Sequence, residues 1–291
     1  MEIKKVGILG MGVQGQGISE VAARAGCEVV VATRHQESLK RGLDLVKDSM
    51  ARGVKRGRLT QKEMDAAWGR IKGTLTPEDF HDCDMLIEAV PEIIEQKKEV
   101  FRQYDGILKP EAIMATDTST LSIVDLAKCT NREDKVCGTH FFWPVPVMEL
   151  VEVVVSIVTS KETAQTVLAF CRSLGKKPSR VKDSPGFITN YLFVAWSLQA
   201  LRLYERGIAT MEDIDNALEK GLNHPMGVFK LHDMAGVDTL YHCQQALWEM
   251  TKDPVYAPVL LLDKMYAAGH LGRKTGKGFY EYKEYRPPSE D

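Results

Sequence analysis

The chain of 291 residues is 44% apolar and 27% charged, the composition of an ordinary globular protein with enough length for two modest domains. Its net charge of −2 gives no electrostatic reason to expect nucleic acid or an anionic membrane as a partner, and no segment approaches the roughly 20 apolar residues that span a bilayer. Six scattered cysteines without a Cys-x-x-Cys pair are typical of a reducing compartment and argue against a metal site, so we expect a cytoplasmic protein without a metal.

The first half of the chain alternates short apolar runs with longer amphipathic patterns. Strands are expected, in chain order, at about 6–9, 28–32, 85–90, 113–116, 136–140, 150–155 and 177–181. Helices are expected at about 14–25, 38–50, 61–70, 92–108, 123–128 and 161–174. This rhythm indicates βαβ units and predicts a Rossmann-type α/β fold, in which a doubly wound, mostly parallel sheet has helices on both faces.

The pattern changes at Asp183-Ser184-Pro185-Gly186. Beyond it we find only helical patterns, at about 187–205, 211–220, 237–250 and 259–269. A Pro-Gly pair between two such regions is typical of a domain boundary. We therefore expect a dinucleotide-binding domain at 1–184 and an all-helical C-terminal domain at 185–291.

A glycine-rich motif follows the first predicted strand, with the sequence Gly10-Met11-Gly12-Val13-Gln14-Gly15. In a G-x-G-x-x-G motif the first glycine permits a tight turn, the second lets the backbone approach a pyrophosphate, and the third lets helix and strand pack closely. The start of the next helix offers free N–H groups to the phosphates. Because the motif lies between a strand and a helix, it predicts a dinucleotide site.

The end of the second predicted strand should contact the adenosine ribose of the cofactor. An NAD enzyme usually has Asp or Glu there, but this chain has Thr33 and Arg34, and no carboxylate before Glu37. A hydroxyl followed by a guanidinium suits a 2′-phosphate, so the sequence favours NADP over NAD. The alternative is that Arg34 is a solvated surface residue and the cofactor is NAD.

A histidine and a glutamate lie on two consecutive predicted strands. His140 ends one strand, Glu152 lies near the start of the next, and the prolines between them favour an extended connection. Neighbouring strands could bring the two side chains together, and the carboxylate would then orient the imidazole for acid–base chemistry. On spacing alone, a structural histidine is the commoner alternative.

Several motifs in combination give the chain a family resemblance. It resembles the 3-hydroxyacyl-CoA dehydrogenases, and among them the 3-hydroxybutyryl-CoA dehydrogenases, over essentially its whole length. The matching segments are Gly10–Gly17, Ile87–Glu92, Asp117–Leu121, His140–Glu152, Asp183–Asn190, His224–Gly227 and Gly272–Tyr280. The resemblance implies an oxidoreductase that reversibly oxidises a (3S)-3-hydroxyacyl-CoA to the 3-oxoacyl-CoA with NAD or NADP.

The resemblance also implies roles for individual residues. His140 matches the catalytic base and Glu152 its partner, while Ser119 and Asn190 match residues that contact the substrate oxygen. The alternative interpretation is that Ser119 caps the short helix that follows it and that Asn190 is an amide on a helix surface.

Further residues match the cofactor side of the family's site. Glu92 and Lys97 match this side, and we place Ala89, Val90 and Ser119 there with them.

The resemblance gives the remaining parts of the chain two further roles. The basic run Arg52, Lys55, Arg56 and Arg58 lies where family members bind the nucleotide part of the acyl-CoA substrate, and we assign Lys55 and Arg56 to it; a solvated charged face is the alternative. The helical C-terminal domain resembles the family's dimerisation module, which implies a homodimer.

Three positions depart from the family pattern. Thr33 replaces the usual carboxylate, which puts the cofactor in doubt. Trp143 replaces the usual Asn of the His-Phe-Phe-Asn-Pro block, which puts the substrate in doubt. Gln14 replaces a common Met, a change that we expect to matter little. Two other hypotheses stay open, a dehydrogenase of the same fold for another hydroxy acid, such as a sugar acid, and a non-catalytic dinucleotide-binding protein.

Overall fold

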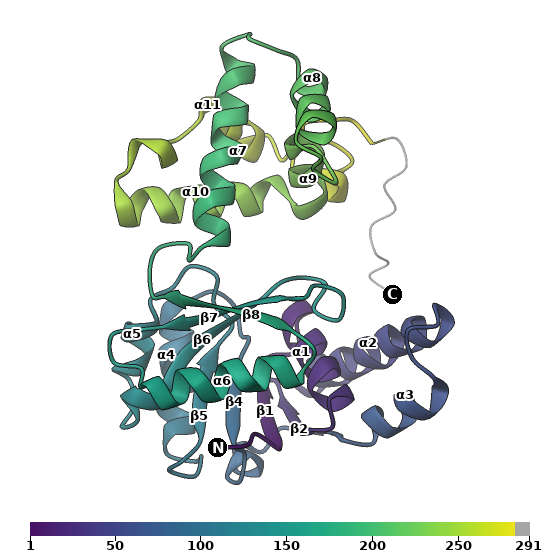
Figure 1. Cartoon of the computed structure of the whole chain (residues 1–291), viewed down its shortest axis with the longest axis vertical. Helices are drawn as coiled ribbons and strands as arrows, with labels where there is room; N and C mark the ends of the chain where they lie inside the picture. Colours follow the sequence, from purple (N-terminus) through teal and green to yellow (C-terminus); the bar gives the residue numbers. More distant parts are fainter. Residues whose placement is uncertain (283–291) are drawn as a thin grey trace. The chain divides into compact units, whose positions relative to one another are not determined.

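Eight short strands form one sheet in the first part of the chain. The computed structural model describes residues 1–282, and the chain divides into two units, Met1–Phe187 and Ile188–Asp291 (Figure 1). The strands are β1 (Lys5–Leu9), β2 (Glu28–Ala32), β3 (Ile71–Thr74), β4 (Met85–Glu88), β5 (Ile113–Thr116), β6 (Val136–Phe141), β7 (Leu150–Val155) and β8 (Lys177–Lys182). Most are runs of buried residues, as expected for strands covered by helices on both faces.

The order of the strands is β3-β2-β1-β4-β5-β6-β7-β8, and every pairing is parallel except the antiparallel pair β6 and β7. The chain winds outward from β1 in one direction and from β4 in the other. In such sheets ligands bind at the carboxyl ends of the strands, where the winding reverses. That place lies beside the turn that follows β1.

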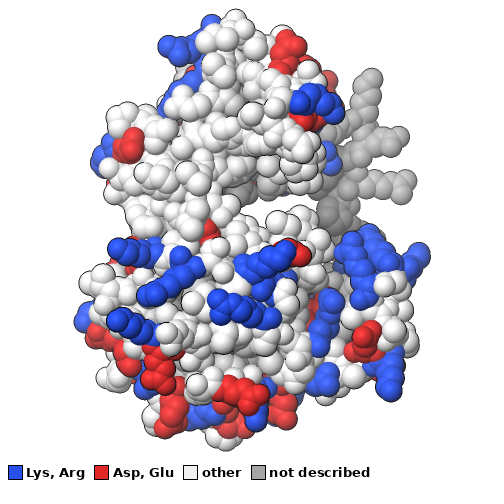
Figure 2. Space-filling view, in the orientation of Figure 1, with Lys and Arg blue, Asp and Glu red and all other residues white. Residues whose placement is uncertain are grey.

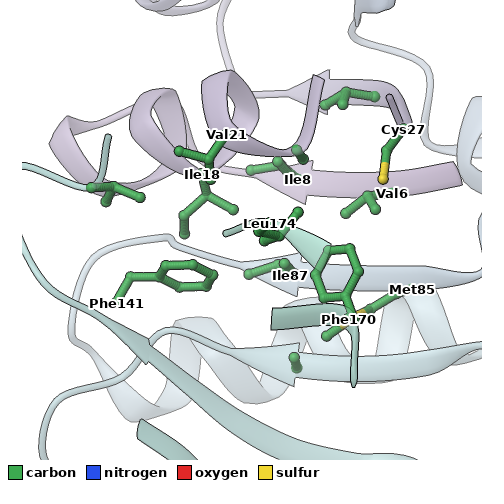
Figure 3. Packing of buried hydrophobic residues seen from close by; sticks show 14 of the residues in the cluster. Val6, Ile8, Ile18, Val21, Cys27, Met85, Ile87, Phe141, Phe170 and Leu174 are labelled. Atoms are coloured by element: carbon green, nitrogen blue, oxygen red, sulfur yellow. The ribbon is translucent and has the colours of Figure 1, made fainter. Parts of the chain in front are cut away.

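Helices cover both faces of the sheet. They are α1 (Val13–Arg24), α2 (Gln36–Lys55), α3 (Gln61–Trp68), α4 (Ile94–Asp105), α5 (Ile123–Ala127) and α6 (Lys161–Ser173), with short turns of 3-10 helix at Pro77–Phe80 and Glu133–Lys135. The apolar faces of α1, α2, α3 and α6 pack in one core, part of which Figure 3 shows, and those of α4 and α5 pack in another. The predicted Rossmann-type fold is thus confirmed for the first unit.

Between residues 188 and 282 the second unit is helical, as predicted, with no strand of its own. Its helices are α7 (Thr189–Glu205), α8 (Met211–Asn216), α9 (Val228–Ala235), α10 (Val237–Thr251) and α11 (Leu260–Ala267), and shorter helical turns lie at Ala217–Gly221, Pro254–Tyr256 and Arg273–Thr275. A buried carboxylate ties the end of the described chain to α9, because Asp233 accepts hydrogen bonds from the N–H groups of Phe279 and Tyr280. None of the described helices is long and apolar enough to cross a membrane.

Two elements were missing from the sequence-based prediction. The strand β3 has the sequence Ile-Lys-Gly-Thr and forms an edge of the sheet, so its apolar signal is weak. The helix α9 follows the Pro225-Met226-Gly227 turn, and its eight residues are too few for a clear periodic pattern.

Candidate active site

The glycine turn between β1 and α1 has no room for side chains at two of its three glycines. Gly10 has a φ of +92°, and a Cβ there would lie 2.5 Å from the carbonyl oxygen of Ala89. A Cβ on Gly15 would lie 1.8 Å from the carbonyl oxygen of Gly10. Gly12, in contrast, is exposed and has open space where its Cβ would stand. The turn therefore packs tightly against the sheet and presents bare backbone to the outside.

This geometry fits the pyrophosphate of a nicotinamide dinucleotide. The helix α1 begins at Val13 with no side-chain cap and no acidic residue in its first turn. Its N-terminal N–H groups and the positive end of its dipole are thus available to an anion. The chain's own backbone, not a cationic side chain, supplies this part of the predicted cofactor site.

The two residues expected to contact the adenosine ribose follow β2. The N–H of Gly10 donates to the carbonyl of Ala32, the last residue of β2, so this strand end lies beside the glycine turn. The Thr33 hydroxyl donates to the backbone carbonyl of His35 at 2.8 Å, and Arg34 is exposed. Arg34 therefore lies at the strand end where the sequence analysis expects the adenosine ribose.

On the other side of the glycine turn, an ionic network joins the end of β4, the segment that follows it, and α4. Lys97 is 1% exposed, and its Nζ lies 2.7 Å from Oε1 of Glu88 and 3.3 Å from Oε2 of Glu92. Burial raises the pKa of Glu88 although Lys97 opposes it. Burial also acts to raise the pKa of Glu92, but Lys97 and hydrogen bonds from the neighbouring turn outweigh it and lower that pKa. Lys97 is thus engaged inside the protein, where it pairs with two carboxylates.

The carboxylate of Glu92 shapes the loop that follows β5. Its Oε1 accepts hydrogen bonds from the hydroxyl of Thr118 and from the backbone N–H groups of Ser119 and Thr120. Three donors converging on one oxygen fix the path of the backbone through this turn. The role of Glu92 here is therefore to position Ser119.

Ser119, His140 and Glu152 form one line of hydrogen bonds. His140 and Glu152 face each other in the register of the antiparallel pair β6 and β7, and Nδ1 of the imidazole lies 2.8 Å from Oε2 of the carboxylate. On the other side of the ring, Nε2 lies 3.1 Å from the hydroxyl oxygen of Ser119. A carboxylate accepts only, so Nδ1 carries the proton and Nε2 is the nitrogen that can exchange one.

The imidazole of His140 is 5% exposed and lies among aromatic rings. The centroid of its ring is 4.6 Å from that of Phe142 and 5.6 Å from that of Phe187. Phe187 ends the Pro185-Gly186 turn with a φ of +53°, an uncommon backbone conformation for a residue with a side chain. Apolar walls of this kind keep water from the imidazole and strengthen its interaction with Glu152.

A cavity of about 440 Å³ lies in the first unit, along one side of α1. Val13, Gln16, Glu20 and Arg24, spaced along that helix, contribute to its wall. The opposite wall comes from the end of α2 and the loop after β6, and it includes Arg52, Arg56, Arg58 and Trp143. Figure 2 shows Lys and Arg side chains gathered over this end of α2. The cavity therefore has an arginine-rich side and leads toward the loop that follows His140.

Comparisons with known proteins identify the family. The sequence model described as "3-hydroxyacyl-CoA dehydrogenase, NAD binding domain" matches residues 5–184, and the one described as "3-hydroxyacyl-CoA dehydrogenase, C-terminal domain" matches residues 186–282. The chain belongs to the 3-hydroxyacyl-CoA dehydrogenase family. The predictions of this family, of an oxidoreductase and of a nicotinamide dinucleotide as its cofactor are thus confirmed.

Relatives of this dehydrogenase match it over nearly all of its length. The 3-hydroxybutyryl-CoA dehydrogenase of Mycobacterium tuberculosis is 41% identical over 282 residues, which cover 96% of this chain and 99% of the relative. The mitochondrial hydroxyacyl-coenzyme A dehydrogenase of Homo sapiens is 38% identical, and the match covers 97% of this chain and 92% of the relative. A crystal structure of (S)-3-hydroxybutyryl-CoA dehydrogenase from Ralstonia eutropha, 39% identical, has a TM-score of 0.94 and covers 97% of this chain and 100% of that one.

The structure of this dehydrogenase brings most of the predicted site residues together within the first unit. Asn190 is the second residue of α7 and belongs to the second unit, so its role stays a prediction. Lys55 ends α2 but does not line the cavity that Arg56 lines. Within residues 1–282, no group of three or more His, Cys, Asp or Glu residues is arranged to hold a metal ion.

The sequence analysis missed Asp117 as a residue of this site, and it missed the contact that Gln14 makes across the site. Asp117 accepts a hydrogen bond from the N–H of Phe141 at 2.8 Å, and the amide of Gln14 donates to the carbonyl of the same residue at 2.9 Å. Gln14, whose replacement of Met was expected to matter little, therefore reaches from the glycine turn to the strand that carries His140.

Proposed function

We propose that this dehydrogenase interconverts a (3S)-3-hydroxyacyl-CoA, such as 3-hydroxybutyryl-CoA, and the 3-oxoacyl-CoA, with His140 as general acid and base. The hydrogen-bonded line from Ser119 through His140 to Glu152 is the observation that supports this proposal. It leaves one nitrogen of a buried imidazole for proton exchange and holds the other on a carboxylate. A site of this design suits a reaction in which a hydroxyl loses its proton as hydride leaves.

In the direction of oxidation, Nε2 of His140 takes the proton of the substrate 3-hydroxyl. Glu152 stabilises the imidazolium that forms, and in the direction of reduction the same nitrogen returns the proton. Ser119 donates a hydrogen bond at the oxygen that changes charge, and we assign the amide of Asn190 to the same oxygen. The nicotinamide, when bound, exchanges the hydride with carbon 3 of the substrate.

We infer that the cofactor is NADP. The supporting observations are the exposed guanidinium of Arg34 just after β2 and the hydroxyl of Thr33 beside it, where an NAD enzyme usually has a carboxylate. Arginine pairs with a phosphate through two parallel hydrogen bonds, and no carboxylate stands there to repel it. Gly10, Gly12, Val13, Gln14 and Gly15 are assigned to the pyrophosphate side of the same cofactor.

Ala89, Val90, Glu92, Lys97 and Ser119 are assigned to the nicotinamide side of the cofactor. The carbonyl of Ala89 touches the glycine turn, and Lys97 and Glu92 hold the loop that carries Ser119. From the geometry we infer that Glu92 and Lys97 support this part of the site, because Lys97 is buried and paired.

The arginine-rich cavity is our candidate for the coenzyme A part of the substrate. Val13 and Arg24 lie at opposite ends of α1, and eleven steps of about 1.5 Å separate them by about 16 Å. This length suits the arm that joins a thioester to its nucleotide phosphates. The arginines at the far end, including Arg56, then neutralise the phosphates, and Lys55 adds to the positive field at the same helix end.

Two further properties are proposed from the family resemblance and the composition. We propose a homodimer formed by the helical unit, in which large apolar side chains such as Leu192 and Ile208 are more than half exposed. We also propose a cytoplasmic location, because the six cysteines are scattered along the chain without a Cys-x-x-Cys pair. Sedimentation of the purified protein tests the first, and fractionation of the source cells tests the second.

The deciding experiment is turnover of acetoacetyl-CoA by the purified protein, followed by the absorbance of reduced nicotinamide. We expect consumption of NADPH, and loss of turnover without loss of cofactor binding in His140→Gln. Turnover of a sugar acid but of no acyl thioester would instead favour the alternative hydroxy-acid dehydrogenase. Unchanged turnover in His140→Gln would remove His140 from its proposed role.

A further inference from the structure

Phe141, the residue after His140, is held at both of its backbone polar groups by side chains. Its N–H donates to Oδ1 of Asp117 at 2.8 Å, and its carbonyl accepts from Nε2 of Gln14 at 2.9 Å. Its ring is 1% exposed and lies in the core cluster with Ile18 and Ile87 (Figure 3). Two backbone contacts and one buried ring fix this residue from three sides.

The hydrogen bond that Asp117 accepts from Phe141 lies just beyond the end of the parallel pairing between β5 and β6. The parallel ladder between β5 and β6 ends at the pair Thr116 and Gly138, two residues before His140. Beyond that pair, a carboxylate oxygen of Asp117 takes the place that a strand carbonyl would have had. The donor N–H belongs to the peptide group between His140 and Phe141, which is attached directly to the Cα of His140. The contact therefore fixes the backbone torsion that orients the imidazole.

Asp117 is buried among other charged groups. It is 8% exposed, its own N–H donates to the carbonyl of Glu88 at 2.8 Å, and burial raises the pKa of its carboxyl. The charged groups that act on it from β4, α4 and the segment between them are Glu88, Glu92 and Lys97. Burying a carboxyl group costs free energy unless hydrogen bonds compensate, and the N–H of Phe141 supplies such a bond.

Gln14 connects the same residue to the cofactor loop. It lies in the first turn of α1, between Gly12 and Gly15 of the glycine turn. Its Nε2 reaches Phe141, while its Oε1 is buried and has no hydrogen-bond partner among residues 1–282. Since Oε1 has no partner among residues 1–282, the hydrogen bond to Phe141 is the contact that orients this amide.

We propose that Asp117 and Gln14 are positioning residues for the dehydrogenase reaction, which together clamp the backbone of Phe141 and so aim His140. Through Gln14 this clamp also joins the loop that binds the dinucleotide to the strand that carries the general base. The proposal rests on the catalytic role of His140 proposed above. Neither residue touches the reacting atoms.

The test compares Gln14→Met and Asp117→Ala with the double variant and the parent. We expect each single change to lower kcat about tenfold, because a small displacement of an acid–base group is costly. In Asp117→Ala the dissociation constant of the reduced cofactor should stay within about twofold, and in both single variants the primary deuterium isotope effect on hydride transfer should increase as chemistry becomes slower. Because both residues act on one backbone segment, the double variant should lose far less than the product of the single losses.

Asp117→Asn keeps a carbonyl oxygen for the N–H of Phe141 and should recover most of the kcat lost in Asp117→Ala. Gln103→Met, a glutamine exchanged on the exposed side of α4, is the matched control. If Asp117→Ala does not fold, Gln14→Met and Asp117→Asn still decide the question.

Three results would overturn the clamp: an unchanged kcat in Gln14→Met, losses that multiply in the double variant, or an Asp117→Asn as impaired as Asp117→Ala. His140→Gln separates this failure from failure of the proposed function. If His140→Gln abolishes turnover while the clamp variants do not reduce it, only the clamp is wrong.

Discussion

Nδ1 of His140 lies 2.8 Å from Oε2 of Glu152 across two antiparallel strands, and the two residues are 5% and 0% exposed. The two residues are direct partners in the register of β6 and β7, so their side chains stand on the same face of the sheet. The strands therefore hold the pair, and no flexible loop has to bring it together. This rigidity is what an acid–base pair requires.

Glu152→Gln tests the charge of this pair. The amide oxygen can still accept the Nδ1 hydrogen, but it cannot stabilise an imidazolium, so kcat should fall at least about 100-fold with little change in cofactor affinity. Steady-state and binding measurements check this. The control is Glu149→Gln, because Glu149 is an exposed glutamate directly before β7. Its kcat should stay near that of the parent. Equal activity of the two variants would contradict the role of Glu152.

Arg34→Ala tests the choice of cofactor. Loss of a charge-assisted contact to the 2′-phosphate should raise the dissociation constant for NADPH about tenfold or more, whereas that for NADH should change little. Fluorescence titration with both cofactors gives the ratio. Arg41→Ala, an exposed arginine on α2, is the control. Equal weakening of both cofactors would show that Arg34 does not contact the phosphate.

Arg56→Ala tests the arginine-rich cavity. We expect the KM for acetoacetyl-CoA to rise about tenfold, since Arg56 lines the cavity, and Lys55→Ala to have the smaller effect. With a short thioester that lacks the nucleotide, neither variant should differ from the parent. If Arg56→Ala raises both KM values alike, the cavity does not bind the nucleotide end of the substrate.

Gly15→Ala tests the packing of the glycine turn. The added Cβ would lie 1.8 Å from the carbonyl oxygen of Gly10, so the turn must move. We expect a loss of about 1–3 kcal/mol in stability, together with loss of dinucleotide binding. Gly69→Ala, where the nearest atom would be 3.4 Å away, should be tolerated. Thermal unfolding and cofactor titration provide the comparison, and a Gly15→Ala protein that binds normally would refute it.

His232 should make the helical unit sensitive to acid. Burial lowers its pKa from 6.5 to about 3, and its Nε2 lies 2.7 Å from the hydroxyl of Ser197. Below pH 6.5 His232 is protonated in the unfolded chain but stays neutral in the folded chain. The free energy of unfolding therefore falls as the pH decreases toward 3. The expected slope is about 1.4 kcal/mol per pH unit from this group.

His232→Gln removes this proton uptake and should flatten the pH dependence of the unfolding midpoint. His81→Gln, at an exposed histidine, should leave the slope as it is. Parallel curves for parent and His232→Gln below pH 6 would count against the buried histidine as the cause.

The parts of the fold and site that depend on residues close in sequence were predictable. A strand, three spaced glycines and a helix start are neighbours in sequence, and β6 and β7 are consecutive strands, so the dinucleotide turn and the pairing of His140 with Glu152 were both predictable. The weak strand β3 and the short helix α9 were not, because neither has enough periodic residues to stand out.

By itself the sequence determined the class of fold, the family, and the residues of the candidate site, because strand and helix periods, glycine spacing and motif order are local properties of the chain. Only the tertiary structure decided that Lys97 is buried between two glutamates, that Arg24 joins the arginines of α2 in one cavity, and that Asp117 and Gln14 meet at Phe141. Apart from those of Lys97, these contacts join residues many positions apart on different elements. They depend on how the strands and helices pack against one another, and local sequence patterns do not reveal which side chains meet in that packing.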